Sequence, residues 1–254
     1  MDYDIGIVKH RRIISPSEGF WMAPAPSGLD PATTAWVNAV IAAGGTVSGA
    51  QQGYVNTLIT GLKADGNFLT SDRLWLYGSE NTQQAGIDII NLATWTNHGQ
   101  TFSANHGYTG DGATTYGDTG FIESTGGAQN YVSGNSCFGF YGLTSGLSSG
   151  KAMGTTSGSA SYWDMNGTAS VDSIGWFPTF ASNGLFSVMG TSATTAIMYH
   201  NGGSPNSTTG TIRHIEYRLI FCKRLQQFWQ CVSICCTANC CCVLRGQSNF
   251  YSRS

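Results

Sequence analysis

The residues best suited to binding chemistry are aromatic rings that stand beside short polar side chains. Tyr162, Trp163 and Asp164 are consecutive, and Asn166 follows two positions later. Aromatic rings can stack on the C–H-rich faces of sugars, whereas carboxylate and amide groups bind sugar hydroxyls. Trp176 offers another ring further along the chain. The pattern predicts a neutral-glycan site made of Tyr162, Trp163, Asp164, Asn166 and Trp176, with packing of the rings in a core as the alternative.

Carboxylates, by contrast, are too sparse for the usual glycosidase arrangement. Glycoside hydrolysis needs two carboxyl groups about 5–10 Å apart, and side chains two or four positions apart share one face of a strand. Between residues 94 and 212 no two acids have that spacing, and Asp164 and Asp172 would meet only across a hairpin turning at Asn166. No Gly-x-Ser-x-Gly motif predicts a serine nucleophile. We therefore expect a protein that is not an enzyme and has no cofactor, with a glycan-active hydrolase as the alternative.

Two groups of residues raise the question of a metal. Asp111 and Asp118 could hold calcium, but their spacing fits no EF-hand loop, and Gly110-Asp111-Gly112 is typical of a tight turn. Six cysteines between Cys231 and Cys242 follow a C-x3-CC-x3-CCC pattern. Structural zinc sites instead pair ligands roughly two to four positions apart, with a longer loop between the pairs. We expect no metal site.

The cysteine run has a simpler interpretation. Seven of the eight cysteines lie between Cys222 and Cys242. Read one nucleotide later, a run of Cys codons becomes Ala and Val codons, and such a shifted frame can encode apolar residues at helical spacing. Our hypothesis is that the residues after about Cys222 are frame-shifted and carry no evolved function. A zinc site and a disulfide cluster are the alternatives.

Composition excludes two classes of partner. Only 10% of the 254 residues are charged, against roughly 25% in an average soluble domain, and the net charge is −2. Lys151 is the single basic residue between Arg73 and Arg213, whereas nucleic-acid binding needs clustered Lys and Arg. We expect no nucleic-acid partner. No apolar run approaches about 18 residues, so we expect no membrane insertion, and the first residues lack the apolar segment of a secretory signal.

The periodicity of apolar residues changes near Thr94. Before it, Asp30-Pro31 and Ser48 are typical starts of two amphipathic helices. After it, short runs rich in Thr, Tyr, Phe and Val alternate with Gly, Asn and Ser turns, as in an all-β sandwich. The predicted strands are 99–105, 113–119, 136–144, 150–156, 160–166, 170–177, 184–190, 194–200 and 209–221.

These patterns divide the chain into four parts. They are an extended N-terminal leader over 1–29, a helical segment packed on the sandwich over 30–93, a β-sandwich domain over 94–221, and the Cys-rich tail over 222–254. The predicted fold class is mainly β, an antiparallel sandwich preceded by a short α-helical segment.

One segment carries a family resemblance. Residues 105–121 read NHGYTGDGATTYGDTGF, which resembles a segment of phage and prophage structural proteins of the tail or virion. The helical pair ending in Lys63-Ala64-Asp65-Gly66, the run 183–188 and the run 199–202 are similar to the same family. The resemblance covers about 30–221 and implies a concanavalin A-like (laminin-G-like) jelly roll. The family's usual ending is an amphipathic helix, which the cysteine run replaces.

The resemblance also implies a function. We expect a virion structural protein, associated with the tail or a fibre, whose lectin-like sandwich serves assembly or adhesion to a host-surface glycan. Its expected partners are other virion proteins and that glycan, its expected state is a homo-oligomer, and its expected location is the virion. A ligand-free decoration domain is a further alternative.

Overall fold

The computed structural model describes one large continuous segment and a series of shorter ones, most of them strands. The described residues are 28–111, 114–122, 130, 137–142, 151–155, 162–164, 169–170, 184–192, 194–200, 206–209, 218–221 and 229–235. The predicted leader over 1–29 therefore lies almost wholly outside them.

The first two helices begin where the sequence predicts. α1 (Pro31–Ala42) starts after Asp30, whose carboxylate accepts a hydrogen bond from the N–H of Ala32 at 2.8 Å. α2 (Gly49–Ala64) starts after Ser48, whose hydroxyl accepts from the N–H of Gln51 at 3.1 Å. Both side chains satisfy N–H groups that a helix start leaves without a partner. The short helices α3 (Asn67–Thr70) and α4 (Thr82–Gly86) follow.

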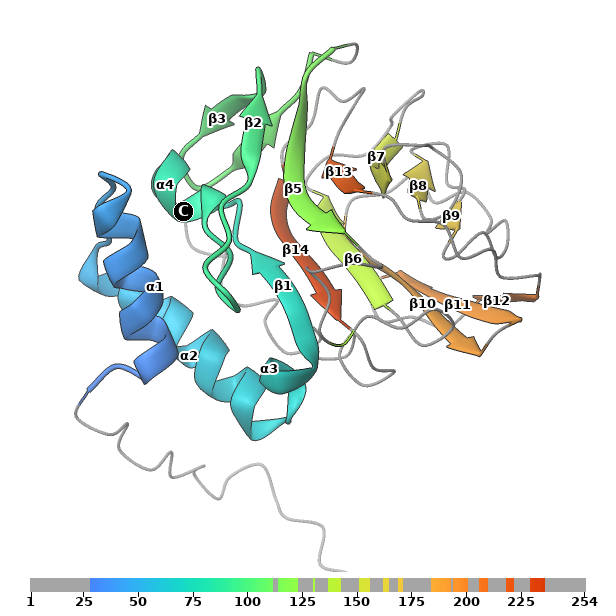
Figure 1. The fold of residues 1–254 in the computed structure, drawn as a ribbon, viewed down its shortest axis with the longest axis horizontal. Coiled ribbons are helices and arrows are strands. Elements are labelled where there is room, and N and C mark those ends of the chain that lie inside the picture. The colour runs from blue at the N-terminus through green and yellow to red at the C-terminus, as the bar shows by residue number, and fades with distance from the viewer. Residues whose placement is uncertain are drawn as a thin grey trace, which may run out of the picture.

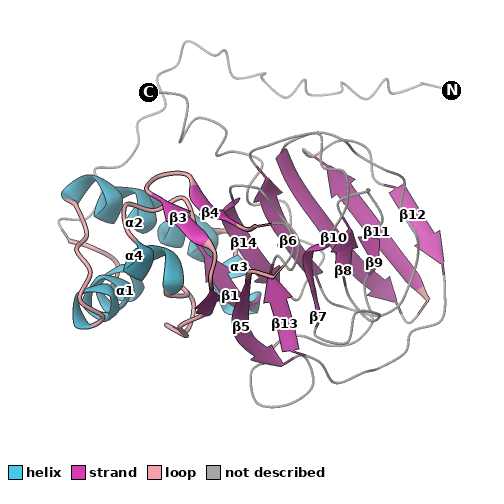
Figure 2. Cartoon of the chain, turned by 90° about the horizontal axis from the view of Figure 1, so that it is seen from above, coloured by secondary structure: helices cyan, strands magenta, loops and turns pink. Residues whose placement is uncertain are grey.

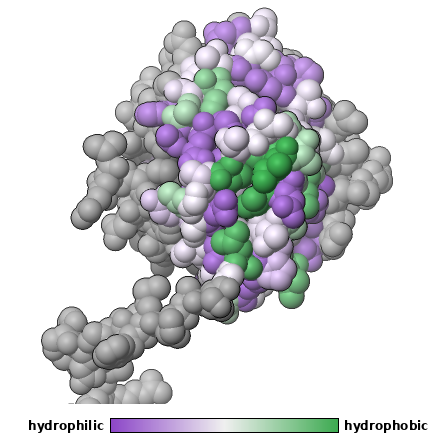
Figure 3. All heavy atoms as spheres, turned by 90° about the vertical axis from the view of Figure 1, so that its left-hand side faces the viewer, coloured by the Kyte–Doolittle hydropathy of each residue, from purple (hydrophilic) through white to green (hydrophobic). Residues whose placement is uncertain are grey.

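α1 and α2 share one apolar core with the segment after α4. Trp36, Val40, Val55 and Ile59 are fully buried, and the indole N–H of Trp36 donates to the carbonyl of Ile87 at 3.2 Å. On the outer side of this helical region, hydrophobic residues form a patch among hydrophilic ones (Figure 3). The exposed large hydrophobic residues of the described segments are Leu29, Ile41, Tyr54, Leu69 and Leu92.

The strands form two six-stranded sheets and one hairpin, in which every strand pair is antiparallel. The first sheet has the order β1 (Ser71–Trp75), β14 (Trp229–Cys235), β6 (Cys137–Gly142), β10 (Gly184–Ser192), β11 (Thr195–His200), β12 (Asn206–Thr209). The second sheet has the order β2 (Thr96–His98), β5 (Tyr116–Ile122), β13 (Arg218–Phe221), β7 (Lys151–Thr155), β8 (Tyr162–Asp164), β9 (Ala169–Ser170). The hairpin joins β3 (Thr101–Ser103) to β4 (Gly107–Thr109).

The two sheets lie as two layers, one over the other, with the helices at one end (Figures 1 and 2). A contact between the layers is the guanidinium of Arg73 on β1, which lies 5.6 Å from the ring centroid of Phe121 on β5. The fully buried ring of Phe121 belongs to the inward set of β5, together with Gly117 and Thr119. The prediction of antiparallel sheets preceded by a few helices is thus confirmed.

Several strands agree with the predicted ranges, and some boundaries differ. β6, β7, β10 and β11 begin within a residue of their predicted starts. The run predicted as one strand over 209–221 contains the end of β12 and the whole of β13, which belong to different sheets. Periodicity reports a local pattern and does not show which sheet a strand joins.

Two strands cross the predicted domain boundaries. β1 comes from the segment predicted as helical, and it forms an edge of the first sheet. β14 comes from the tail and lies between β1 and β6, where Val232 pairs with Trp75 and Cys235 with Cys137. Cys137 is disulfide-bonded. The boundary at residue 222 therefore does not separate the tail from the sheet. Whether the tail is frame-shifted stays a prediction.

Among the described residues, no helix has the length and apolar character needed to cross a bilayer.

Candidate functional site

The predicted glycan site falls on the second sheet. Tyr162, Trp163 and Asp164 form β8, between β7 and β9. Their backbone partners on β7 are Gly154, Met153 and Lys151, in that order. The remaining two members of the predicted site, Asn166 and Trp176, lie outside the described residues. The structure thus places three of the five residues on one strand, next to the edge strand β9.

Asp111 organises a turn before β5. Its carboxylate accepts hydrogen bonds from the backbone N–H groups of Thr114 at 2.8 Å and Thr115 at 3.0 Å, and from both threonine hydroxyls. The hydroxyl of Thr115 in return accepts from the N–H of Asp111 at 2.8 Å. These local bonds are those of an Asp-led turn, as the sequence predicts. In the part of the chain that the structure describes, no three His, Cys, Asp or Glu side chains are grouped so as to hold a metal ion.

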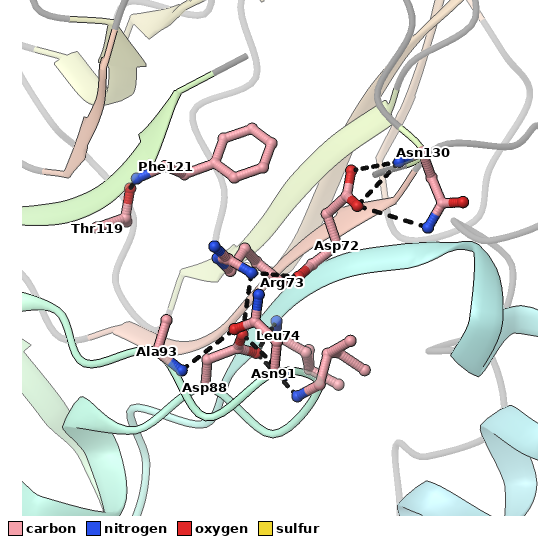
Figure 4. Close-up of polar contacts among 10 residues, drawn as sticks. Asp72, Arg73, Leu74, Asp88, Asn91, Ala93, Thr119, Phe121 and Asn130 are labelled. Atoms are coloured by element: carbon pink, nitrogen blue, oxygen red, sulfur yellow. Dashed lines mark hydrogen bonds and ion pairs between the residues drawn. The ribbon is translucent and has the colours of Figure 1, made fainter. Parts of the chain in front are cut away.

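A buried charged cluster lies along the edge strand β1, and no motif in the sequence indicates it (Figure 4). Asp88 is fully buried. One of its carboxylate oxygens accepts from the N–H of Leu74 at 2.7 Å and of Ile90 at 3.0 Å, and the other accepts from the N–H of Asn91 at 3.2 Å. That second oxygen also lies 3.7 Å from a guanidinium nitrogen, Nη1, of Arg73.

Arg73 is the cation of this cluster, and only 8% of its surface is exposed. Its Nη1 donates to the carbonyl of Asp72 at 3.0 Å, and its Nε has no hydrogen-bond partner among the described residues. Burial lowers the pKa of the Arg73 guanidinium from its usual value, against the attraction of Asp88 and Asp72.

The two carboxylates of the cluster have different partners. Burial raises the pKa of Asp88 to about 6, although its three backbone hydrogen bonds and Arg73 act in the opposite direction. Asp72 accepts a hydrogen bond from the N–H of Asn130 at 3.0 Å, and the amide of Asn130 donates to the carbonyl of Leu69. Asp72 therefore holds residue 130 beside the α3–β1 junction.

The geometry of the cluster supports a structural role. The N–H of Ile89 donates to the carbonyl of Leu74 at 2.8 Å, and the N–H of Leu74 donates to Asp88. The segment after α4 thus satisfies both backbone groups of Leu74, as a neighbouring strand would do, and it covers the edge of β1. Asp72 and Asp88 are 3% and 0% exposed, so neither carboxylate can reach a glycosidic oxygen. An Asp-Arg pair before an apolar run carries no spacing signal that could have revealed this cluster from the sequence.

Comparison with solved structures finds similarity to a sialidase. The structure of Trypanosoma rangeli sialidase in complex with sialic acid matches with a TM-score of 0.50 and 8% identity, over 78% of this chain and 39% of the sialidase chain. The same sialidase with 2,3-difluorosialic acid (a covalent intermediate) matches at 0.47 and 9% identity, over 79% and 39% of the two chains. With the inhibitor DANA it matches at 0.42 and 10% identity, over 78% and 38%. The chain thus spans well under half of the sialidase's length. No family model and no curated protein matches the chain.

One expectation is corrected by this comparison. The sequence predicted a protein that is not an enzyme, because its carboxylates are sparse and badly spaced. That prediction is contradicted, since the solved structure that matches with a TM-score of 0.50 is that of an enzyme. At 8% identity the likeness itself shows the fold alone. Spacing along one strand shows only which side chains share a face of that strand, and it gives no information on carboxylates that come from different strands.

Proposed function

We propose that this protein is a structural component of a phage or prophage virion, associated with the tail or a fibre. In this proposal a concanavalin A-like jelly-roll sandwich serves assembly with other virion proteins or adhesion to a host-surface glycan. The observation that carries the proposal is the pair of six-stranded antiparallel sheets in two layers, the architecture that jelly rolls require. The segment that resembles virion proteins, residues 105–121, contributes β4 and all but the last residue of β5 to this architecture.

A carbohydrate ligand is supported by two further observations. The sialidase that shares the fold was solved in complex with a sugar, sialic acid. In this chain, β8 consists of Tyr162, Trp163 and Asp164, a combination of rings and a carboxylate suited to sugar binding. A single stacked ring binds weakly, but linked copies raise avidity by about 10²–10⁴-fold. A homo-oligomer would therefore make such a site useful for adhesion.

The test is a glycan array probed with the full chain, displayed as a tetramer on streptavidin. We expect retention on a subset of glycans and reduced retention for Trp163→Ala, with an unchanged thermal unfolding midpoint. Tyr54→Ala is the matched control, because Tyr54 is a half-exposed aromatic residue on α2. Its binding should equal that of the unmodified chain. Equal loss in both variants, or no retention on any glycan, would contradict glycan adhesion.

Glycan hydrolysis is the second candidate, favoured by the fold similarity to a sialidase. The test is release of reducing sugar from the glycans retained on the array. Asp164→Asn should abolish release if Asp164 provides a carboxyl group for the reaction. Release that persists unchanged in Asp164→Asn would exclude that role for Asp164.

A further inference from the structure

A stacked pair of rings stands on the open edge of the second sheet. His98 on β2 and Tyr116 on β5 are cross-strand neighbours, and their ring centroids lie 4.3 Å apart with planes inclined by 15°. β2 is the edge strand, and all three of its residues, Thr96 to His98, are exposed. In Figure 1, β2 lies beside β5 on the side away from β13. Because the two rings face each other, the outer face of the exposed His98 ring is the aromatic surface that solvent reaches.

Polar groups lie on the same face, one step further along the two strands. Along β5, Gly117, Thr119 and Phe121 are buried, whereas Tyr116 and Asp118 are partly exposed. Side chains two positions apart share a face of a strand, about 7 Å apart. Asp118 is the partner of Thr96 in the ladder, just as Tyr116 is the partner of His98. The face thus combines two rings with a carboxylate and a hydroxyl. The distance between the rings and these polar groups is close to the width of one sugar ring.

Hydrogen bonds and a close contact hold described residues at the end of this face. The side-chain amide of Asn97 accepts a hydrogen bond from the backbone N–H of Gln100 at 2.8 Å and donates one to the backbone carbonyl of Gln100 at 2.9 Å. Gly99, at φ +84°, lies so close to Thr115 that an added Cβ would be 3.1 Å from its methyl group. Thr115 in turn belongs to the turn that Asp111 organises. A site held in place before binding loses little conformational entropy when a ligand arrives.

The charges of this region select against anionic sugars. Residues 96–118 contain two carboxylates, Asp111 and Asp118, and no Lys or Arg. A carboxylated sugar would meet the like charge of Asp118, whereas a neutral sugar would offer hydroxyl donors to Asp118 and C–H groups to the His98 ring.

We propose that His98 and Tyr116, with Asp118 and Thr96 beside them, bind an uncharged hexopyranose unit of a glycan. This proposal rests on the proposed glycan adhesion and gives it a site away from β8. The outer face of the His98 ring, supported by Tyr116, supplies the stacking surface. Asp118, which also accepts from the N–H of Gly120 at 2.8 Å, accepts hydrogen bonds from the sugar hydroxyls. The alternative is a cross-strand pair that contributes only to sheet stability.

The test measures binding of the full chain to neutral and sialylated glycans, both on arrays and by titration of the retained ones. His98→Ala and Tyr116→Leu should each weaken binding of the neutral glycans by about five- to 150-fold, by analogy with the loss of stacking between a nucleic-acid base and one aromatic ring. His98→Phe, which keeps a ring, should retain binding. Thr60→Ala, a change at an exposed position on α2, is the control and should bind as the unmodified chain. Thermal unfolding of every variant checks that the sheet remains folded.

Each other outcome overturns the proposal in a distinguishable way. Binding that survives His98→Ala and Tyr116→Leu but is lost in Trp163→Ala would place the glycan at β8, leaving the proposed adhesion intact. Stronger binding of sialylated than of neutral glycans would overturn the ligand class. Absence of binding by the unmodified chain would overturn both this site and glycan adhesion. Loss of binding in Thr60→Ala as well would show that the effect is not specific to the ring pair.

Discussion

The buried carboxylate of Asp88 should make stability fall as the pH rises from about 4 to 7. The pKa of Asp88 is raised from 3.8 to about 6 in the folded protein, chiefly by burial. Between these two values the folded state holds a proton on Asp88 that the unfolded state has already lost. Because the folded state binds more protons in this window, the free energy of unfolding decreases with increasing pH. The favourable contribution is complete below 3.8 and is lost as the pH passes through about 6.

The size of the effect follows from the pKa difference. One pKa unit corresponds to about 1.4 kcal/mol, so a difference of roughly two units corresponds to about 3 kcal/mol. Asp88→Asn removes the titration and keeps a carbonyl oxygen for the N–H groups of Leu74 and Ile90. The free energy of unfolding of the unmodified protein, relative to Asp88→Asn, should therefore decrease by about 2.5 kcal/mol between pH 4 and 7.

The assay is urea unfolding of both proteins at a series of pH values. The control is Asp30→Asn, because the Lys63 ammonium, 2.6 Å from Asp30, lowers the pKa of that carboxyl. The pH dependence of the free energy of unfolding has the opposite sign for Asp30. Its stabilising contribution is present above the usual pKa of an Asp carboxyl and is lost as the pH falls. A difference between the unmodified protein and Asp88→Asn that stays constant, or grows with pH, would refute the reasoning. It would mean that Arg73 and the three N–H groups lower the pKa of Asp88 by at least as much as desolvation raises it.

Three further changes test the packing, a helix cap and the tail. Gly117→Ala would place a Cβ 1.4 Å from the indole of Trp95, so it should destabilise the fold by about 1–3 kcal/mol or more. The control is Gly61→Ala, in open space within α2, which should stabilise the fold by about 0.5–1 kcal/mol. A thermal unfolding midpoint that moves equally in both variants would contradict the close approach of Gly117 to Trp95. Ser48→Ala should cost about 1 kcal/mol, because α2 loses its N-cap, and an unchanged urea midpoint would argue against that cap. Deletion of residues 223–254 removes β14 from between β1 and β6, so thermal unfolding of the first sheet, followed by circular dichroism, should no longer be cooperative. A truncated chain as stable as the full one would instead support the frame-shift hypothesis. The nucleotide sequence tests the same hypothesis.

Local chemistry in the sequence determined the helices and many strands. Asp30 and Ser48 could be predicted as caps because an N-cap bond spans only two or three residues. The turn led by Asp111 is local for the same reason. The strands β6, β7, β10 and β11 could be found because apolar and aromatic runs between Gly and Ser turns mark them without knowledge of their partners. Of the candidate site, the sequence placed Tyr162, Trp163 and Asp164 on a strand.

Only the tertiary structure decided which strands are neighbours and which charges are buried. β14 lies between β1 and β6 although about 90 to 155 residues separate it from them along the chain, and no local pattern encodes such a pairing. Arg73 and Asp88 form an ion pair because the segment after α4 closes the edge of β1. His98 and Tyr116, 18 positions apart, stack because two strands of the second sheet share a register. Desolvation, ion pairing and ring stacking depend on distances across the fold, and those distances exist only once the sheets have formed.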